Sequence, residues 1–409
     1  MRIAVMVAMV LAGMGSVCAT AGAEATGTGT KAVAASNNAF GLDLFGKLAE
    51  KKGNLFFSPY SISSALAMAY AGARGDTAAQ MAKTLHFSLE PAKLHPAFGS
   101  LTNSLNAAGK LNEFELSTAN ALWIQKGEKL LQDFLDLTKS AYGAEPHLVD
   151  FAKATEEARV TINRWVEEQT RDKIKELIQK GIVDSATVLV LTNAIYFKGL
   201  WAHEFTKAGT SEAPFTLASD EKVQVPTMHQ KGEFGYYQGD GFQMLELPYK
   251  GEMLSMVFIL PAKPDGLADL EKSLTAETLA KWLGALKSEE VAIAIPKFKA
   301  TCRFRLEEAL KSMGMPAAFS LPPADFSGIT GVKDLFIGAV IHQAFVDVNE
   351  KGTEAAAATA IVVKRGGAPQ PPKNVFRADH PFLFLLRDTR SGAILFMGRL
   401  MNPAGSDGE

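Results

Sequence analysis

The chain reads Asn349-Glu-Lys-Gly-Thr-Glu-Ala-Ala-Ala-Ala-Thr-Ala-Ile-Val-Val-Lys-Arg-Gly-Gly-Ala-Pro-Gln-Pro-Pro-Lys-Asn374 between two segments with strand patterns, Ala339 to Val348 and Phe382 to Arg387. No turn chemistry would hold so long a connection compactly, and long structureless connections inside a compact domain are usually functional or disordered. An interdomain linker is the simplest alternative. The residues after Asn374 are too few for an independent domain. The segments on both sides therefore belong to one fold, and the stretch between them is a long connection that extends from it.

The two halves of this segment differ in composition. In the first half, Thr353, Ala355, Ala357 and Thr359 fall on one face at the period of a strand, and none is bulky or charged. The arm could thus add as a strand to a sheet, although a helical Ala-rich arm without further role is the other interpretation. The second half, Lys364-Arg365-Gly366-Gly367, places a basic pair beside glycines. An extended backbone with an exposed Arg is what a trypsin-like protease binds.

The pattern of apolar residues changes along the chain from helical to strand-like. Helical spacing predicts helices over Phe40 to Ala49, Ser61 to Ala71 and Thr155 to Lys180. Later segments are typical of strands, and the last two flank a turn that predicts a hairpin: Thr187 to Tyr196, Met253 to Leu260, Val291 to Phe298, Ala339 to Val348, Phe382 to Arg387 and Ala393 to Leu400. Helices first and strands later predict the α+β class.

Charge and composition exclude several classes of protein. The 409 residues carry 42 Lys+Arg against 44 Asp+Glu, a formal net charge of −2. A nucleic-acid partner is not expected, since a phosphate-binding surface normally appears as a basic excess. Hydrophobic content of 47% and charged content of 21% are typical of an ordinary globular protein. Length alone would suggest two or three domains.

The N-terminus has the pattern of a secretory signal over residues 1–23. Arg2 precedes an apolar run, and small residues offer cleavage sites after Ala21 or Ala23. We expect a secreted protein, periplasmic or extracellular, with lipoprotein anchoring at Cys18 as the minor alternative. Residues 24–36, rich in Gly, Ala and Thr, are predicted to form a flexible tail. No later run is long enough to span a membrane, and the remaining Cys302 has no partner for an internal disulfide and is expected to be buried.

Catalytic and metal-binding motifs are missing from the sequence. There is no G-x-S-x-G, H-E-x-x-H or C-x-x-C pattern, and no two His residues have the short helical spacing of a metal site. The run from Gly41 to Lys47 matches the first positions of a phosphate-binding loop motif, but Leu48 occupies the position where that motif requires Ser or Thr. We therefore expect no enzyme activity, no cofactor and no metal.

Six motifs in sequence order resemble the serpins, the family of serine protease inhibitors. They are Asn54-Leu-Phe-Phe-Ser-Pro-Tyr-Ser-Ile62, Leu191-Thr-Asn-Ala-Ile-Tyr-Phe-Lys-Gly-Leu-Trp201, Val225-Pro-Thr-Met228, Val348-Asn-Glu-Lys-Gly-Thr-Glu-Ala-Ala-Ala-Ala-Thr359, Ala378-Asp-His-Pro-Phe382 and Leu395-Phe-Met-Gly-Arg399. The resemblance implies one domain over residues 37–403, followed by a tail at 404–409. It also implies three β-sheets, about nine helices, a monomer, and an exposed reactive-centre loop over about residues 350–374.

The resemblance further implies a mechanism and its residues. A serine protease, or by extension a cysteine protease, attacks the loop and is trapped as an acyl-enzyme while the arm inserts as a new strand of a sheet. Similarity assigns the hinge to Glu350, Gly352, Thr353, Ala355, Ala357 and Thr359. It assigns a polar cluster beneath the parting strands to Ser58, Ser61, Asn193 and His342, and the start of insertion to Trp201. A non-inhibitory serpin with a binding or chaperone-like role is the alternative function.

The reactive bond stays open between two positions. Family spacing from Glu350 points to Gly366 as the residue before the cleaved bond, whereas side-chain chemistry favours Arg365. Cleavage of Arg365–Gly366 implies a trypsin-like target, and cleavage of Gly366–Gly367 an elastase- or subtilisin-like one.

Overall fold

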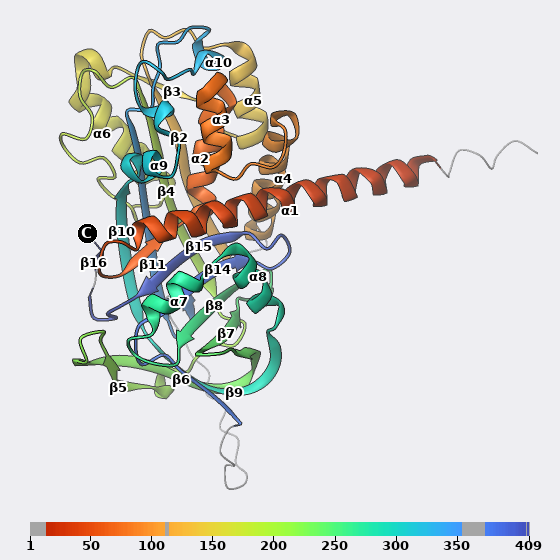
Figure 1. Cartoon of the computed structure of the whole chain (residues 1–409), viewed down its shortest axis with the longest axis vertical. Coiled ribbons are helices and arrows are strands. Elements are labelled where there is room, and N and C mark those ends of the chain that lie inside the picture. Colours follow the sequence, from red (N-terminus) through yellow and green to blue (C-terminus); the bar gives the residue numbers. More distant parts are fainter. Residues whose placement is uncertain (1–13, 111–113, 354–372, 406, 409) are drawn as a thin grey trace, which may run out of the picture.

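A computed structural model describes residues 14–110, 114–353, 373–405 and 407–408 (Figure 1). The described helices are α1 Met14–Leu48, α2 Pro59–Gly72, α3 Gly75–Thr84, α4 Pro91–Lys110, α5 Gln132–Tyr142, α6 Phe151–Gln169, α7 Leu267–Ser273, α8 Ala276–Gly284, α9 Glu307–Ser312 and α10 Ser327–Thr330. The described strands are β1 Leu55–Phe57, β2 Phe114–Gln125, β3 His147–Val149, β4 Leu189–Leu200, β5 Thr210–Thr216, β6 Lys222–Gln238, β7 Phe242–Pro248, β8 Leu254–Pro261, β9 Lys287–Pro296, β10 Phe298–Arg305, β11 Ala339–Asn349, β12 Gly352–Thr353, β13 Asn374–Arg377, β14 Phe382–Asp388, β15 Ile394–Leu400 and β16 Asp407–Gly408. The predicted α+β class is confirmed.

The strands in the described part form two hydrogen-bonded sheets. The seven-stranded sheet, called the central sheet below, has the order β16-β10-β11-β12-β4-β2-β3. The nine-stranded sheet has the order β1-β15-β14-β8-β7-β6-β9-β13, with β5 beside β6. Three sheets were expected. The long strand β6 pairs with β5, β7 and β9 in turn, so hydrogen bonds join two of the expected sheets into one.

The helix α2 contacts strands of both sheets and packs into two hydrophobic cores. Ser58 caps its N-terminus by accepting a hydrogen bond from the Ser61 N–H, and Pro59 occupies the first helical position. One side of α2 packs into a core with Tyr60 and Ala67, and the other into a second core with Ile62 and Leu66. Small buried residues such as Ala65 and Ala69 let both sheets approach the helix closely. The motif around Ser58 therefore positions a buried helix end directly beneath the central sheet.

The first helix corrects the prediction for the N-terminal tail. Residues 24–36 were expected to be flexible, but α1 runs without interruption from Met14 to Leu48. Val33 and Ala34 are buried in the same core as Leu94 of α4. A Cβ on Gly29 would lie 3.3 Å from Ala97 of α4. The small residues thus serve close helix packing, which composition alone did not distinguish from flexibility.

Two further predicted elements have different ends in the structure. The helix predicted to reach Lys180 ends at Gln169, yet Ile174, Leu177 and Ile178 are buried beside α6 against the central sheet. Asn163 exchanges two side-chain hydrogen bonds with the main chain of Ile178, which fixes this irregular segment. The strand predicted over Val291 to Phe298 is divided between β9 and β10 in different sheets. The apolar pattern predicted burial correctly but not the backbone conformation.

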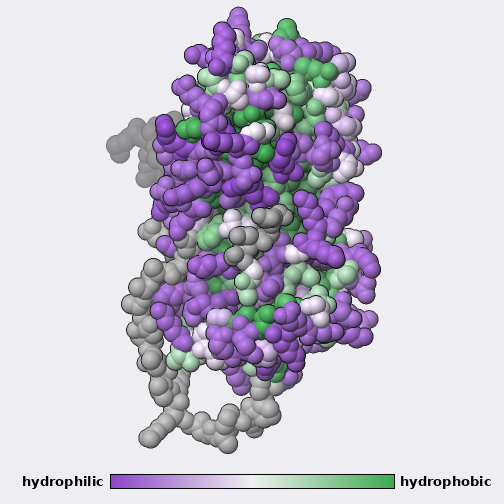
Figure 2. Space-filling model, turned by 90° about the vertical axis from the view of Figure 1, so that its left-hand side faces the viewer, coloured by the Kyte–Doolittle hydropathy of each residue, from purple (hydrophilic) through white to green (hydrophobic). Residues whose placement is uncertain are grey.

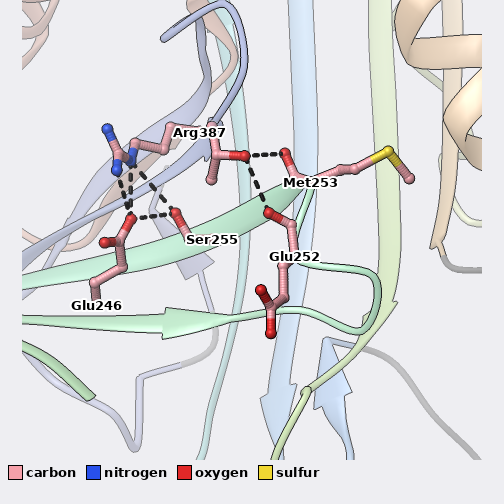
Figure 3. Close-up of polar contacts among 6 residues, drawn as sticks. Glu246, Glu252, Met253, Ser255 and Arg387 are labelled. Atoms are coloured by element: carbon pink, nitrogen blue, oxygen red, sulfur yellow. Dashed lines mark hydrogen bonds and ion pairs between the residues drawn. The ribbon is translucent and has the colours of Figure 1, made fainter. Parts of the chain in front are cut away.

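A polar contact joins three neighbouring strands of the nine-stranded sheet. Figure 3 shows Arg387 of β14 donating to the carboxylate of Glu246 of β7, with a shortest distance of 2.7 Å. Ser255 of β8 donates to the same carboxylate at 2.6 Å. The predicted hairpin of β14 and β15 is confirmed, and it pairs through β14 with β8. This contact therefore fixes the hairpin that follows the segment 354–373.

The outer surface is mixed in polarity. In the view of Figure 2, hydrophilic residues cover most of the face and apolar residues appear in separate small areas. Among the helices in the described ranges, none has the length and apolar character needed to cross a membrane. Cys302 is fully buried, as predicted.

Candidate functional site

The two central strands of the central sheet pair over part of their length and then separate. β11 and β4 run in parallel and pair from Ala339 with Val190 to Phe345 with Tyr196. Beyond this point the two-residue strand β12 lies between them. Thr353 pairs with Val348 of β11 and with Gly199 of β4. The sheet therefore has space for a further strand, and β12 occupies the start of that space.

Thr353 is held in the space by a buried hydrogen bond. Its side chain has no exposed surface, and its hydroxyl lies 2.7 Å from the hydroxyl of Tyr249. Burial raises the pKa of Tyr249 far above its ordinary value, so the phenol stays neutral. Tyr249 stacks on Trp201 with ring centroids 4.5 Å apart. Trp201, predicted from the resemblance, thus contributes to the wall against which the inserted residue packs.

Glycine is the one residue type that fits at position 352. Its φ is +150°, and a Cβ there would lie 1.9 Å from the carbonyl oxygen of Gly199. No rotation of a neighbouring side chain could relieve this contact, because the obstructing atom belongs to the backbone of β4. Glycine at this position therefore allows the chain to turn from β11 into the sheet.

Replacing Gly352 with Ala is expected to expel β12 from the sheet. The local cost should be about 2 kcal/mol, because both the backbone conformation and the contact with Gly199 become unfavourable. The check is hydrogen exchange at the amide of Thr353, which should become faster, together with a change in Trp201 fluorescence. Gly284→Ala is the matched control, since a Cβ at Gly284 has open space. Unchanged exchange at Thr353 would contradict the assignment of β12.

The carboxylate of Glu350 anchors the turn before β12. It lies 3.0 Å from the ammonium of Lys297 and accepts a hydrogen bond from Thr210 at 3.0 Å. Burial alone would raise the pKa of Glu350, but hydrogen bonds from its own backbone N–H, Lys297 and Thr210 lower it overall. Trp201 adds a main-chain bond to the Lys351 carbonyl and an indole bond to the Asn349 carbonyl. The turn is thus held from β4, β5 and the loop before β10.

Below β12, a polar cluster connects the strands β2, β4 and β11 with the start of α2. We define the cluster as Ser58, Ser61, Asn120, Asn193 and His342. The amide of Asn193 donates to Ser61 Oγ and to Asn120 Oδ1 at 2.5 Å each, and Ser61 Oγ donates to Asn120 Oδ1 at 2.8 Å. The backbone N–H of Ser58 donates to His342 Nε2 at 3.1 Å. The structure thus brings together all four predicted members.

Asn120 is the member that the sequence analysis missed. Strand registers place Asn120, Asn193 and His342 side by side on adjacent strands. The sequence carries no distinct signal for Asn120, because β2 also contains other polar residues such as Ser117 and Thr118 and was itself not predicted. The register shows that each of the three strands contributes one polar side chain to the same row.

The hydrogen bonds define the charge state of His342. Because Nε2 accepts from Ser58, the proton lies on Nδ1, which donates to Asn193 Oδ1. The imidazole is fully buried, and this burial lowers its pKa to about 3 from the ordinary 6.5, with a hydrogen bond to the backbone of Asn193 opposing the shift. His342 is therefore neutral, and protonation of Nε2 would break the bond to Ser58.

Acid is expected to destabilise the protein through His342. The unfolded chain binds a proton near pH 6.5 and the folded chain only near pH 3. The contribution of His342 is therefore constant above pH 6.5, and stability falls by about 1.4 kcal/mol per pH unit between pH 6.5 and 3. Urea unfolding from pH 7 to pH 4 should show this slope, and His342→Gln should lose it. Parallel slopes for the two proteins would contradict the assignment.

Six predicted residues lie outside the described residues: Ala355, Ala357, Thr359, Arg365, Gly366 and Gly367. The structure describes both flanks of their segment. Before it, Thr353 pairs in the central sheet, and after it, Asn374 begins β13, which pairs with β9 of the nine-stranded sheet. Within the described residues, no group of three or more His, Cys, Asp or Glu side chains is arranged to hold a metal ion.

Comparisons with known proteins agree on one family. The family model described as serpin (serine protease inhibitor) matches residues 35–403. Leukocyte elastase inhibitor of Bos taurus is 47% identical over 381 residues, which is 91% of this chain and 99% of that protein. The Homo sapiens protein of the same name is 44% identical with the same coverage. Among solved structures, human thyroxine-binding globulin complexed with its hormone has a TM-score of 0.83 and 32% identity, covering 92% of this chain and 100% of that chain. Uncleaved ovalbumin has a TM-score of 0.80 and 32% identity, covering 91% and 100%.

Proposed function

This chain belongs to the serpin family, and we propose that it inhibits a serine protease by covalent trapping and loop insertion. The observation that carries the proposal is β12, which already pairs with both β4 and β11. An arm that continues from Thr353 in the same direction would become a full central strand. The family is described as one of serine protease inhibitors, and the chain is not an enzyme.

The proposed reaction begins as ordinary proteolysis. The serine hydroxyl of the protease attacks the carbonyl carbon of the reactive bond and loses its proton to the catalytic base. The peptide nitrogen leaves with a proton, and an ester joins the loop to the protease. Insertion of the arm then carries the attached protease along the central sheet and distorts its active site before water can hydrolyse the ester. Each inhibitor molecule is consumed once.

The sequence of the arm supports inhibition over a non-inhibitory role. Insertion must be faster than deacylation, and a bulky or charged inward side chain would have to lose its water on the way. Thr353, Ala355, Ala357 and Thr359 are all small, and the stretch from Thr353 to Ala360 has no Pro and the single charge of Glu354. Thr353 itself is already buried.

We propose Arg365–Gly366 as the reactive bond and a trypsin-like enzyme as the target. A guanidinium can pair with the acidic pocket of such a protease, whereas Gly366 offers no side chain. Cleavage of Gly366–Gly367 by an elastase-like enzyme is the second candidate. The names of the relatives, leukocyte elastase inhibitors, support this second bond.

Incubation with trypsin, elastase and subtilisin tests both parts. At least one enzyme should give a complex that survives boiling in detergent, and the mass of the released C-terminal peptide identifies the bond. The control variant Arg365→Ala should lose the complex with trypsin and keep any complex with elastase. Clean cleavage by all three enzymes without a complex would overturn inhibition and favour the non-inhibitory role.

Export remains a proposal that rests on the N-terminal pattern. A positive start, an apolar run and the sites after Ala21 and Ala23 are typical of a cleaved signal. Sequencing the N-terminus of protein recovered outside the producing cells tests it. A first residue after Ala21 or Ala23 is the expected result, and an intact Met1 inside the cells would contradict it.

A further inference from the structure

A cleft of about 360 Å³ lies beside the outer edge of β2, away from the opening between β4 and β11. Its walls include Thr118 and Asn120 of β2 and three rings, Tyr142, His147 and Trp165. His147 and Trp165 meet edge to face with centroids 5.2 Å apart. Neither the hinge nor the proposed reaction uses this cleft, although Asn120 contributes its side chain to the polar cluster.

The strand register shows which backbone groups of β2 face the cleft. The N–H of Gln125 donates to Val188, next to β4, and the N–H of Lys126 donates to Val149 of β3 on the opposite edge. Because backbone groups alternate between the two edges of a strand, even-numbered residues of β2 point away from β4. Thr118 and Asn120 belong to that set. β3 pairs with β2 only from Trp123 to Gln125, so this strand does not reach Thr118 and Asn120.

Charge in the cleft is low. Glu145, at the rim, is exposed and pairs with Lys139 at 2.8 Å. Apart from the rings of His147 and Trp165, the other polar side chains of the walls are amides and hydroxyls, among them Asn106 and Thr102, and Thr102 already bonds Tyr60. Burial lowers the pKa of His147, which favours its neutral form. The ligand that suits this cleft is therefore an uncharged extended chain. It would offer amide groups along one edge to β2 and an apolar or aromatic side chain to the rings of the cleft.

We propose that this cleft binds a short extended peptide of a partner protein as an added strand beside β2. The peptide would pair with the main chain of Thr118 and Asn120, in the manner of strand addition at an exposed edge. One side chain of the peptide would lie against Trp165 and His147, where aromatic contacts add to the main-chain bonds. The added strand would lie on the same edge of β2 as β3, beside the residues that β3 does not reach.

The probe is acetyl-Thr-Val-Phe-Val-Thr-amide, with two versions that carry N-methyl groups on alternate residues. At a sheet edge only the N–H groups along one edge of the peptide form hydrogen bonds with the protein. The version methylated on that edge should therefore bind about tenfold more weakly, and the version methylated on the other edge should bind normally. A peptide inserted between β4 and β11 would form hydrogen bonds along both of its edges, and both methylated versions would then bind weakly. Hydrogen exchange should show new protection at residues 116–122 and none at 197–200.

Thr118→Pro is the matched protein variant. It removes the N–H that faces the cleft but leaves the hydrogen bonds between β2 and β4 in place. An edge strand tolerates Pro where the N–H points away from the sheet. The variant should weaken binding about tenfold, and Thr118→Ala, which keeps the N–H, should not. The proposal is overturned if no binding occurs up to about 1 mM, if both methylated peptides fail, or if Thr118→Pro binds the unmodified peptide as well as Thr118→Ala does. The methylated peptides decide the question even if Thr118→Pro folds poorly.

Discussion

Thr353→Arg is expected to turn the inhibitor into a substrate. Thr353 is fully buried between β4 and β11 and bonds Tyr249, so an arginine there would need a charge to be buried without a partner. That cost is several kcal/mol, and it would slow insertion while leaving the attack on the loop untouched. The ratio of cleaved protein to covalent complex should rise at least about a hundredfold. Quantitative gels with the protease that gives the complex measure this ratio.

A conservative variant separates charge from the loss of a hydrogen bond. Thr353→Ser keeps the hydroxyl near Tyr249 and should still form the complex. A complex yield for Thr353→Arg equal to that of the unaltered protein would contradict the claim that insertion of the arm depends on burial of this residue between β4 and β11.

Asn193→Leu is expected to weaken the closed sheet more than any other change in the polar cluster. The side chain of Asn193 is fully buried and bonds Ser61, Asn120 and His342. Leucine has similar size but leaves these partners without Asn193, at about 1–3 kcal/mol for each buried group that loses its bond. A loss of roughly 3 kcal/mol in the free energy of unfolding should lower the urea midpoint.

A single hydrogen bond elsewhere on α2 provides the comparison. Ser63 is buried and donates to Asn37 at 3.0 Å, so Ser63→Ala should cost only about 1 kcal/mol. Equal midpoints for the two variants would mean that the cluster is not a special link between the parting strands. In that case Asn193 would count as one more buried polar group.

Part of the hinge was predicted from the residues and part from the resemblance. Thr353 belongs to a row of small side chains at the period of a strand, which the sequence itself displays, whereas Glu350 and Gly352 were assigned by the resemblance to serpins. Asn120 could not be predicted, because its role depends on the register of β2 against β4, which is a long-range property. The part of α1 before Phe40 was missed for a related reason: Gly29 and Ala34 appear flexible in isolation and become ordered only against α4.

Burial was easier to predict than backbone shape. Ile174, Leu177 and Ile178 belong to the helical pattern predicted over Thr155 to Lys180. They are buried, but their segment has positive φ values at Arg171, Asp172 and Glu176 in place of a helix. The paired state of β12 was also not foreseen, since nothing in the order Gly352-Thr353 tells whether the arm is inside or outside the sheet before cleavage. That state depends on Tyr249, which lies about a hundred residues away in the sequence.

The most direct test of loop insertion is the thermal unfolding midpoint before and after one cut within residues 354–372. If the arm continues β12 as a full strand, the cut protein should gain a complete set of ladder bonds with β4 and β11 and unfold at a clearly higher temperature. An unchanged or lower midpoint in protein that is cut once and still folded would contradict insertion.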